Sequence, residues 1–112
     1  MYKNIFDTHA HYEDEQFDCD RDELLSSFPE NGISGVVTCG TDIITSEKSI
    51  ALAEKYPFIY AAVGFHALNL DSLTADWCGD IKKLAARKKV VAIGEIGLDY
   101  HYERDSREKQ LE

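Results

Sequence analysis

The chain has 112 residues, a length that suits one small domain or a piece of a larger one. Hydrophobic residues make up 44% and charged residues 29%, as in ordinary soluble globular proteins. The net charge is −9, and nine acids against two bases in the first 30 residues argue against a protein that coats DNA. A nuclease stays compatible with this charge, because divalent cations supply positive charge locally.

The cysteines and the N-terminus indicate a cytoplasmic protein. The three cysteines form no C-x-x-C pair, which favours free thiols in a reducing compartment. The N-terminus has no apolar signal region, so no signal peptide is expected. No apolar run approaches the ~18 residues of a membrane span, so no membrane partner is expected either.

The first half of the chain alternates between apolar strands and amphipathic helices. Ile5–Phe6 begins a strand that runs into Asp7-Thr8-His9. A helix is predicted from about Asp20 to Pro29, with its leucines on one face and acids opposite. The β-branched run from Ile33 to Cys39 is typical of a buried strand. A second helix begins near Thr45 and ends before Tyr56-Pro57.

The second half repeats the alternation. Phe58 to Gly64 and Val90 to Glu95 are predicted strands, and Asp71 to Lys89 is predicted to contain the helix between them. A further helix starts near Asp105 or Ser106, either of which is a suitable cap, and the sequence given ends within it. Near-continuous apolar strands that alternate with helices predict one α/β domain, 1–112, with a parallel sheet and the helices outside.

Asp7-Thr8-His9-Ala10-His11 is the sharpest motif, and it lies where the first strand ends. In a parallel α/β fold, side chains at the carboxyl ends of strands face the functional rim. Residues two apart share one face of a strand, so His9 and His11 can chelate one metal as neutral imidazoles. Asp7 shares that face and could orient a histidine or take part in the ligand shell. The plainer interpretation is a pair of solvated histidines.

Glu95 ends the fourth predicted strand, in the apolar stretch Ala-Ile-Gly-Glu-Ile-Gly. A carboxylate in such surroundings needs a partner, and a cation is a natural one. Its two oxygens could bridge two metals roughly 3.5–4 Å apart. The alternative is a structural ion pair.

His66 closes the third strand on the same rim and could bind a substrate phosphate or act as an acid. Arg104, after the fourth strand, is a plausible phosphate contact. An ordinary histidine of the rim is the alternative for His66. His101 and Tyr102 are expected on the loop surface, and Thr41 and Asp42 show nothing beyond loop chemistry.

DTHAH after the first strand, VGFH after the third and AIGEIGLDY after the fourth resemble the TatD family of metal-dependent deoxyribonucleases. The resemblance covers essentially the whole chain and implies a distorted (β/α)₈ TIM barrel. It implies that His9, His11 and Glu95 bind one or two divalent ions (Mg²⁺, Mn²⁺ or Zn²⁺), with Glu95 also catalytic. His66 would face the substrate, and the reaction would be hydrolysis of DNA phosphodiesters.

The sequence departs from this family in two ways. Ala67 follows His66 where the family usually has proline. The family's further ligands, two histidines after strands five and six and an aspartate after strand eight, are not in these 112 residues. A TIM barrel needs roughly 250 residues. The chain therefore reads as an amino-terminal parallel half-barrel of four strands, expected to show little turnover by itself and either to self-associate or to be marginally stable.

Two rival functions remain open. Other hydrolases of the amidohydrolase type share the H-x-H motif but usually carry lysine or another group after strand four, where this chain has Glu95. The missing ligands favour instead a non-catalytic, metal-binding half-barrel module. A panel of DNA and amide substrates separates the first rival, and metal analysis with His9→Ala separates the second from a metal-free structural fragment.

Overall fold

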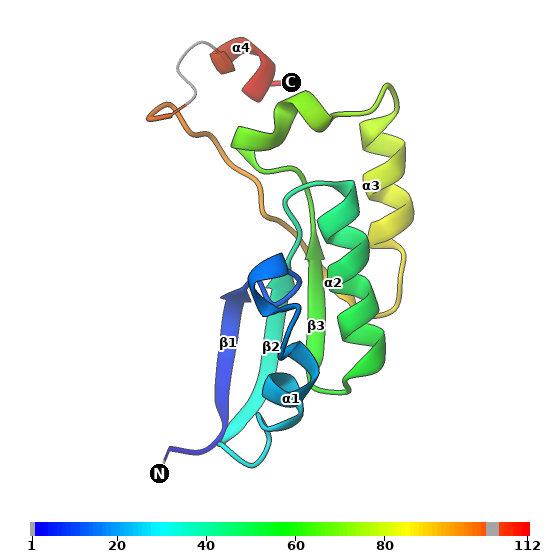
Figure 1. Cartoon of the computed structure of the whole chain (residues 1–112). Coiled ribbons are helices and arrows are strands. Elements are labelled where there is room, and N and C mark those ends of the chain that lie inside the picture. Colours follow the sequence, from blue (N-terminus) through cyan, green and yellow to red (C-terminus); the bar gives the residue numbers. More distant parts are fainter. Residues whose placement is uncertain (1, 103–105) are drawn as a thin grey trace.

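The computed structural model describes residues 2–102 and 106–112. Four strands form one parallel sheet in the order β1-β2-β3-β4. The strands are β1 (Ile5–Ala10), β2 (Ile33–Cys39), β3 (Ile59–Val63) and β4 (Val90–Ile93). This sheet, with helices between its strands, confirms the predicted parallel half-barrel (Figure 1).

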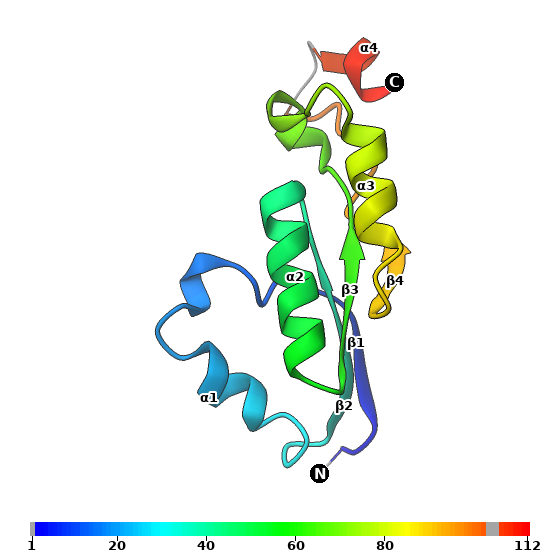
Figure 2. The ribbon, with the colours of Figure 1, turned by 90° about the vertical axis from the view of Figure 1, so that its right-hand side faces the viewer.

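The helices connect the strands and pack mainly on one face of the sheet. They are the α-helices α1 (Arg21–Ser26), α2 (Ile43–Lys55), α3 (Trp77–Ala85) and α4 (Arg107–Gln110), and the 3₁₀ helices η1 (Glu15–Phe17) and η2 (Ala67–Ser72). Figure 2 shows α1 and α2 on one side of β1 to β3. α4 lies beside η2, beyond the carboxyl ends of the strands (Figure 1).

The core lies between the helices and the sheet. Alternate strand residues such as Val36, Ile59 and Val63 are fully buried there, against Leu25 of α1 and Ile50 of α2. This is the period-2 pattern of a strand buried on its helix-facing side. The core is therefore contiguous across α1, α2, the central strands and the end of α3.

The opposite face of the sheet carries apolar residues without a helix over them. Phe6 is 50% exposed, and its ring stacks on Tyr60 at a centroid distance of 6.4 Å. The ring also lies against Gly35, where a Cβ would collide with it. The chain thus leaves one apolar sheet face largely open to solvent.

Some element boundaries differ from the sequence prediction. α2 begins two residues early because Asp42 caps it: the Asp42 carboxylate accepts from the Thr45 amide at 2.8 Å in a capping box. The predicted helix from Asp71 is confined to α3, since η2 and an extended link precede it and the Asp76 side chain caps its first turn. Within the described ranges, no helix combines the length and apolar character needed to cross a bilayer.

Candidate metal centre

β1 presents the two histidines of the first motif at the carboxyl end of the sheet. His9 lies in β1 and His11 directly follows it. The Asp7 carboxylate accepts a hydrogen bond from the His9 main-chain amide at 3.1 Å. Asp7 thus contacts the backbone of His9 and not its ring, and it does not join the cluster of side chains described below.

The segment that follows β2 holds the other two site residues in place. The Gly40 carbonyl accepts from the Glu95 amide at 2.8 Å, two residues beyond the end of β4. The Thr41 carbonyl accepts from the His66 amide at 2.9 Å and from the Asn69 side chain at 3.1 Å. The main chain after β2 thus connects Glu95 and His66 to the centre of the sheet.

The side chains of His9, His11 and Glu95 converge. Nε2 of His9 lies 3.2 Å from Nε2 of His11 and 3.2 Å from Oε2 of Glu95, and Nε2 of His11 lies 3.1 Å from the same oxygen. Metal–ligand bonds of about 2.0–2.2 Å at angles of about 90–110° put neighbouring ligand atoms about 2.8–3.6 Å apart. The triangle therefore fits one small divalent cation without rearrangement.

Hydrogen bonds give the two rim histidines different roles. Nδ1 of His11 lies 2.9 Å from the Cys39 carbonyl oxygen, which only accepts, so this nitrogen carries the proton and Nε2 keeps its lone pair for a ligand. Nδ1 of His66 accepts from the Leu68 amide at 3.0 Å, which leaves the neutral ring's proton on Nε2. That Nε2 lies 3.5 Å from Oε1 of Glu95, so His66 faces the site as a donor.

Burial raises the pKa of two titratable groups near the site. Desolvation raises the pKa of the Cys39 thiol, which therefore keeps its proton at neutral pH and is a poor metal ligand. Burial, with the charge of Asp7 as a second cause, also raises the pKa of the Tyr12 hydroxyl. The candidate ligands of the centre are thus imidazoles and a carboxylate rather than a thiolate.

The loop after β4 contributes less than the sequence suggested. Arg104 lies outside the described residues, so its predicted phosphate contact has no structural test. His101 and Tyr102 are exposed, as expected for loop surface, and their amides donate to the Asp99 carboxylate. The Asp99 carboxylate thus stabilises the turn that follows it in the same loop.

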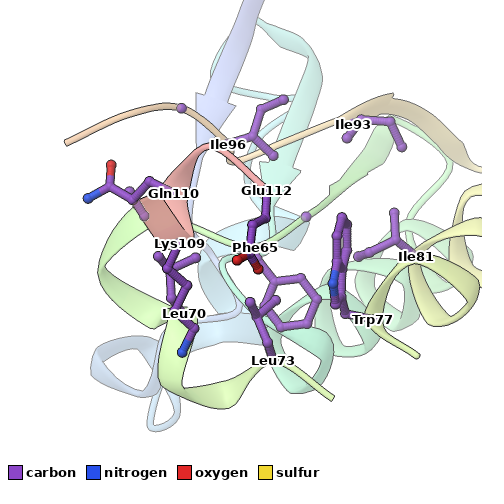
Figure 3. Close-up of a pocket in the computed structure, with 13 residues that line it drawn as sticks. Phe65, Leu70, Leu73, Trp77, Ile81, Ile93, Ile96, Lys109, Gln110 and Glu112 are labelled. Atoms are coloured by element: carbon purple, nitrogen blue, oxygen red, sulfur yellow. The ribbon is translucent and has the colours of Figure 1, made fainter. Parts of the chain in front are cut away.

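A separate apolar pocket of about 180 Å³ lies beside the site (Figure 3). Phe65, Leu73, Trp77 and Ile96 line it together with residues of η2, α3, β4 and α4. None of the described histidines lines this pocket. Gly64 and Gly97 also line this pocket, which is distinct from the candidate cation site.

Sequence reasoning missed Glu13 and Thr38 beside the centre. Glu13 is buried, accepts the Thr38 hydroxyl at 2.6 Å and lies 3.3 Å from Nδ1 of His11. Its only signal in sequence was the spacing of two residues after His11, hidden among the many acids that follow. The capping role of Asp42 was missed as well, although Asp-x-x-Thr before an apolar stretch indicates such a cap.

Fold and site together define a parallel β/α half-barrel with a candidate metal centre at the carboxyl ends of its strands. The family model for TatD related DNase matches residues 6–112. The chain belongs to this family, which confirms the resemblance drawn from the motifs.

Individual relatives agree with this assignment. The chain is 40% identical over 108 residues to an uncharacterized metal-dependent hydrolase, YabD of Bacillus subtilis, covering 96% of this chain and 42% of that protein. It is 31% identical over 107 residues to the 3′-5′ ssDNA/RNA exonuclease TatD of Pantoea ananatis, covering 95% and 41%. The crystal structure of the Escherichia coli TatD homolog YJJV superposes with a TM-score of 0.83 at 30% identity, covering 96% and 42%. The chain thus spans less than half the length of these relatives.

Proposed function

We propose that the chain provides the first part of the metal centre of a hydrolase that cleaves DNA phosphodiester bonds. The observation that carries this proposal is the triangle formed by Nε2 of His9, Nε2 of His11 and Oε2 of Glu95. When bound there, one or two Mg²⁺, Mn²⁺ or Zn²⁺ ions would activate water as Lewis acids and offset the charge of a phosphodiester.

Each residue of the site offers different atoms to an ion or to the substrate. His9 and His11 would hold the ion with their Nε2 lone pairs, while Oε2 of Glu95 completes that ligand set. Oε1 of Glu95 points the other way, toward His66, and is available for a second ion. His66 would donate its Nε2 proton to a non-bridging phosphate oxygen and so orient the substrate. Arg104 remains a proposed second contact to phosphate.

DNA as the substrate is favoured over the rival classes by the relatives, and the charge of the site would make its binding depend on metal. The Pantoea ananatis relative is named for single-stranded DNA and RNA. Among the described residues, no lysine or arginine belongs to the cluster of His9, His11, Glu95 and His66. A polyanion could approach such a site only with cations in place, which links substrate binding to the metal.

We further propose that residues 1–112, the amino-terminal part of the enzyme domain, have little turnover by themselves. Three protein ligands leave one position of a tetrahedral ion, or three positions of an octahedral ion, to water. The histidines and aspartate that the family resemblance adds would come from parts of the relatives that this chain does not span. Metal uptake and efficient hydrolysis are therefore expected to separate in this chain.

Assays of the purified chain with Mn²⁺, Mg²⁺ or Zn²⁺ test the proposal. The substrates are a 5′-labelled single-stranded oligodeoxynucleotide, the matching RNA and a panel of amides. We expect metal uptake by elemental analysis, and residual turnover only on phosphodiesters, the class for which the Pantoea ananatis relative is named.

His11→Ala is the control, and it should abolish both the uptake and any residual turnover. Turnover on amides alone would contradict the proposed substrate class, and absence of metal uptake would contradict the centre itself. Metal uptake with no hydrolysis of any substrate would favour a non-catalytic metal-binding module. Rapid nuclease turnover would refute the expectation of low activity.

We also propose that the isolated chain self-associates through the open face of the sheet. Phe6 on that face and Val91 on the edge strand are each at least half exposed, and soluble monomers rarely leave such an apolar sheet surface bare. Sedimentation velocity should show a concentration-dependent dimer that Phe6→Ser weakens and Ile44→Ser, on the exposed side of α2, does not. A well-folded monomer at all concentrations would contradict this.

A further inference from the structure

The chain buries a carboxylate directly behind the candidate metal centre. Glu13 is 5% exposed and lies two residues after His11, where the chain turns away from the sheet. Its Oε2 accepts the Thr38 hydroxyl at 2.6 Å, and its Oε1 lies 3.3 Å from Nδ1 of His11. Carboxylates are almost never this deeply buried unless a positive group or a metal compensates them.

No permanent cation compensates this carboxylate. Among residues 2–102 and 106–112, no lysine or arginine nitrogen lies within 4 Å of its oxygens. Arg21 is near, but its guanidinium pairs with the Asp18 carboxylate at 2.6 Å and donates to the carbonyls of Tyr12 and Asp14. Arg21 Nη2 also reaches the Glu13 main-chain carbonyl at 3.4 Å, but within the described residues the imidazole of His11 is the one ionisable cation within 4 Å of the Glu13 carboxylate.

His11 lies between this carboxylate and the other members of the cluster. Its Nδ1–H points at the Cys39 carbonyl oxygen, 2.9 Å away, with Oε1 of Glu13 as a second acceptor. Its Nε2, on the opposite edge of the ring, lies 3.1 Å from Oε2 of Glu95. A cation on Nε2 would therefore polarise the same ring whose far edge faces Glu13.

We propose that Glu13 is a positioning residue of the metal centre: it holds the His11 ring through Nδ1–H and compensates the bound cation through that ring. This inference rests on the proposed metal centre and assigns to it a carboxylate beyond the three ligands. Thr38 fixes the carboxylate, since its hydroxyl occupies Oε2 and leaves Oε1 facing the imidazole. Partners of this kind behind a ligating histidine typically change metal affinity 10–100-fold.

The proposal predicts opposite effects on metal affinity and on the metal-free fold. Glutamine at position 13 keeps a carbonyl oxygen for His11 and an amide for Thr38, but it removes the negative charge. Metal affinity should fall because the cation loses its compensating charge. The stability of the metal-free chain should not fall, since a buried, unpaired charge is removed. If Glu13 had a merely structural role, Glu13→Gln would lower the stability of the metal-free chain and leave its metal affinity unchanged.

The experiment compares wild type, Glu13→Gln and Asp14→Asn by calorimetric titration with Zn²⁺ and Mn²⁺ and by urea unfolding of the metal-free proteins. Asp14→Asn makes the same charge change one residue along, at an exposed side chain. We expect Glu13→Gln to lower affinity about 10–100-fold. Asp14→Asn should stay within about threefold of wild type, because solvent screens its charge.

A second test uses the wild-type chain alone, so its result does not depend on whether a variant folds. Nitrogen-15 chemical shifts of the metal-free His11 ring should show a proton on Nδ1, and a ring protonated on Nε2 alone would overturn the proposal. Glu13→Gln affinity within threefold of wild type, or a loss of affinity that only parallels a loss of stability, would overturn it as well. Failure of the wild-type chain to bind either ion would instead refute the metal centre, and this inference with it.

Discussion

Glu95→Gln should lower the affinity of the chain for Zn²⁺ or Mn²⁺ by at least about 100-fold, more than the loss of a partner behind a ligand usually costs. The substitution preserves the size of the side chain and leaves the backbone amide of residue 95 free to donate to the Gly40 carbonyl. It replaces the single anionic member of the triangle by a neutral amide, so the remaining ligands are two neutral imidazoles. Calorimetric titration of the two proteins under identical conditions measures the difference.

A matched control separates the ligand from its charge. Glu47→Gln makes the same change on the exposed side of α2 and should leave metal affinity at the wild-type value, since the long-range field of one exposed charge is screened. Equal affinities for wild type and Glu95→Gln would remove Glu95 from the ligand set, and with it the carboxylate of the proposed centre.

Ile59→Ala should destabilise the chain by about 2–5 kcal/mol, the usual cost of emptying a fully buried aliphatic site. Ile59 begins β3 with 0% exposure, at the middle of the helix-covered core. Small domains are stable by only about 5–15 kcal/mol, and this chain leaves one sheet face open, so the loss takes a large part of the total. Urea unfolding followed by far-ultraviolet circular dichroism gives the change.

Ile44→Ala provides the comparison for this measurement. Ile44 is 65% exposed on α2, and removal of its side chain should change stability by no more than about 0.5 kcal/mol. Similar losses for the two alanine variants would mean that the helix-facing side of the sheet is not the main core.

The sequence was sufficient for most of the fold because its two central strands are short, apolar and largely buried. The strand from Ile33 to Cys39 was predicted at its actual boundaries, and β3 within one residue at each end. Boundaries set by side-chain hydrogen bonds were less accessible. The start of α2 depends on the contact between Asp42 and Thr45, and η2 replaces the first turns expected after Asp71.

The candidate ligands could be predicted for a different reason. Parallel strands place their carboxyl ends on one rim, so His9, His11, His66 and Glu95 were expected together from topology alone, and the structure places them together. Glu13 could not be found in this way. It follows a turn, and its burial depends on Thr38 from a neighbouring strand, a contact with no periodicity in the sequence. That these residues bind metal stays a prediction until it is measured.

The short edge strand β4 has a kinetic consequence for the site. Its four residues are partly or largely exposed, and only β3 pairs with it, so its amides should exchange with solvent through local opening well before those of β2. Glu95 follows this edge strand by two residues, whereas His9 and His11 lie in or directly after the opposite edge strand, β1. A bound ion would tie the two ends together, and slower deuterium uptake at Val91 and Ala92 would then report its occupancy.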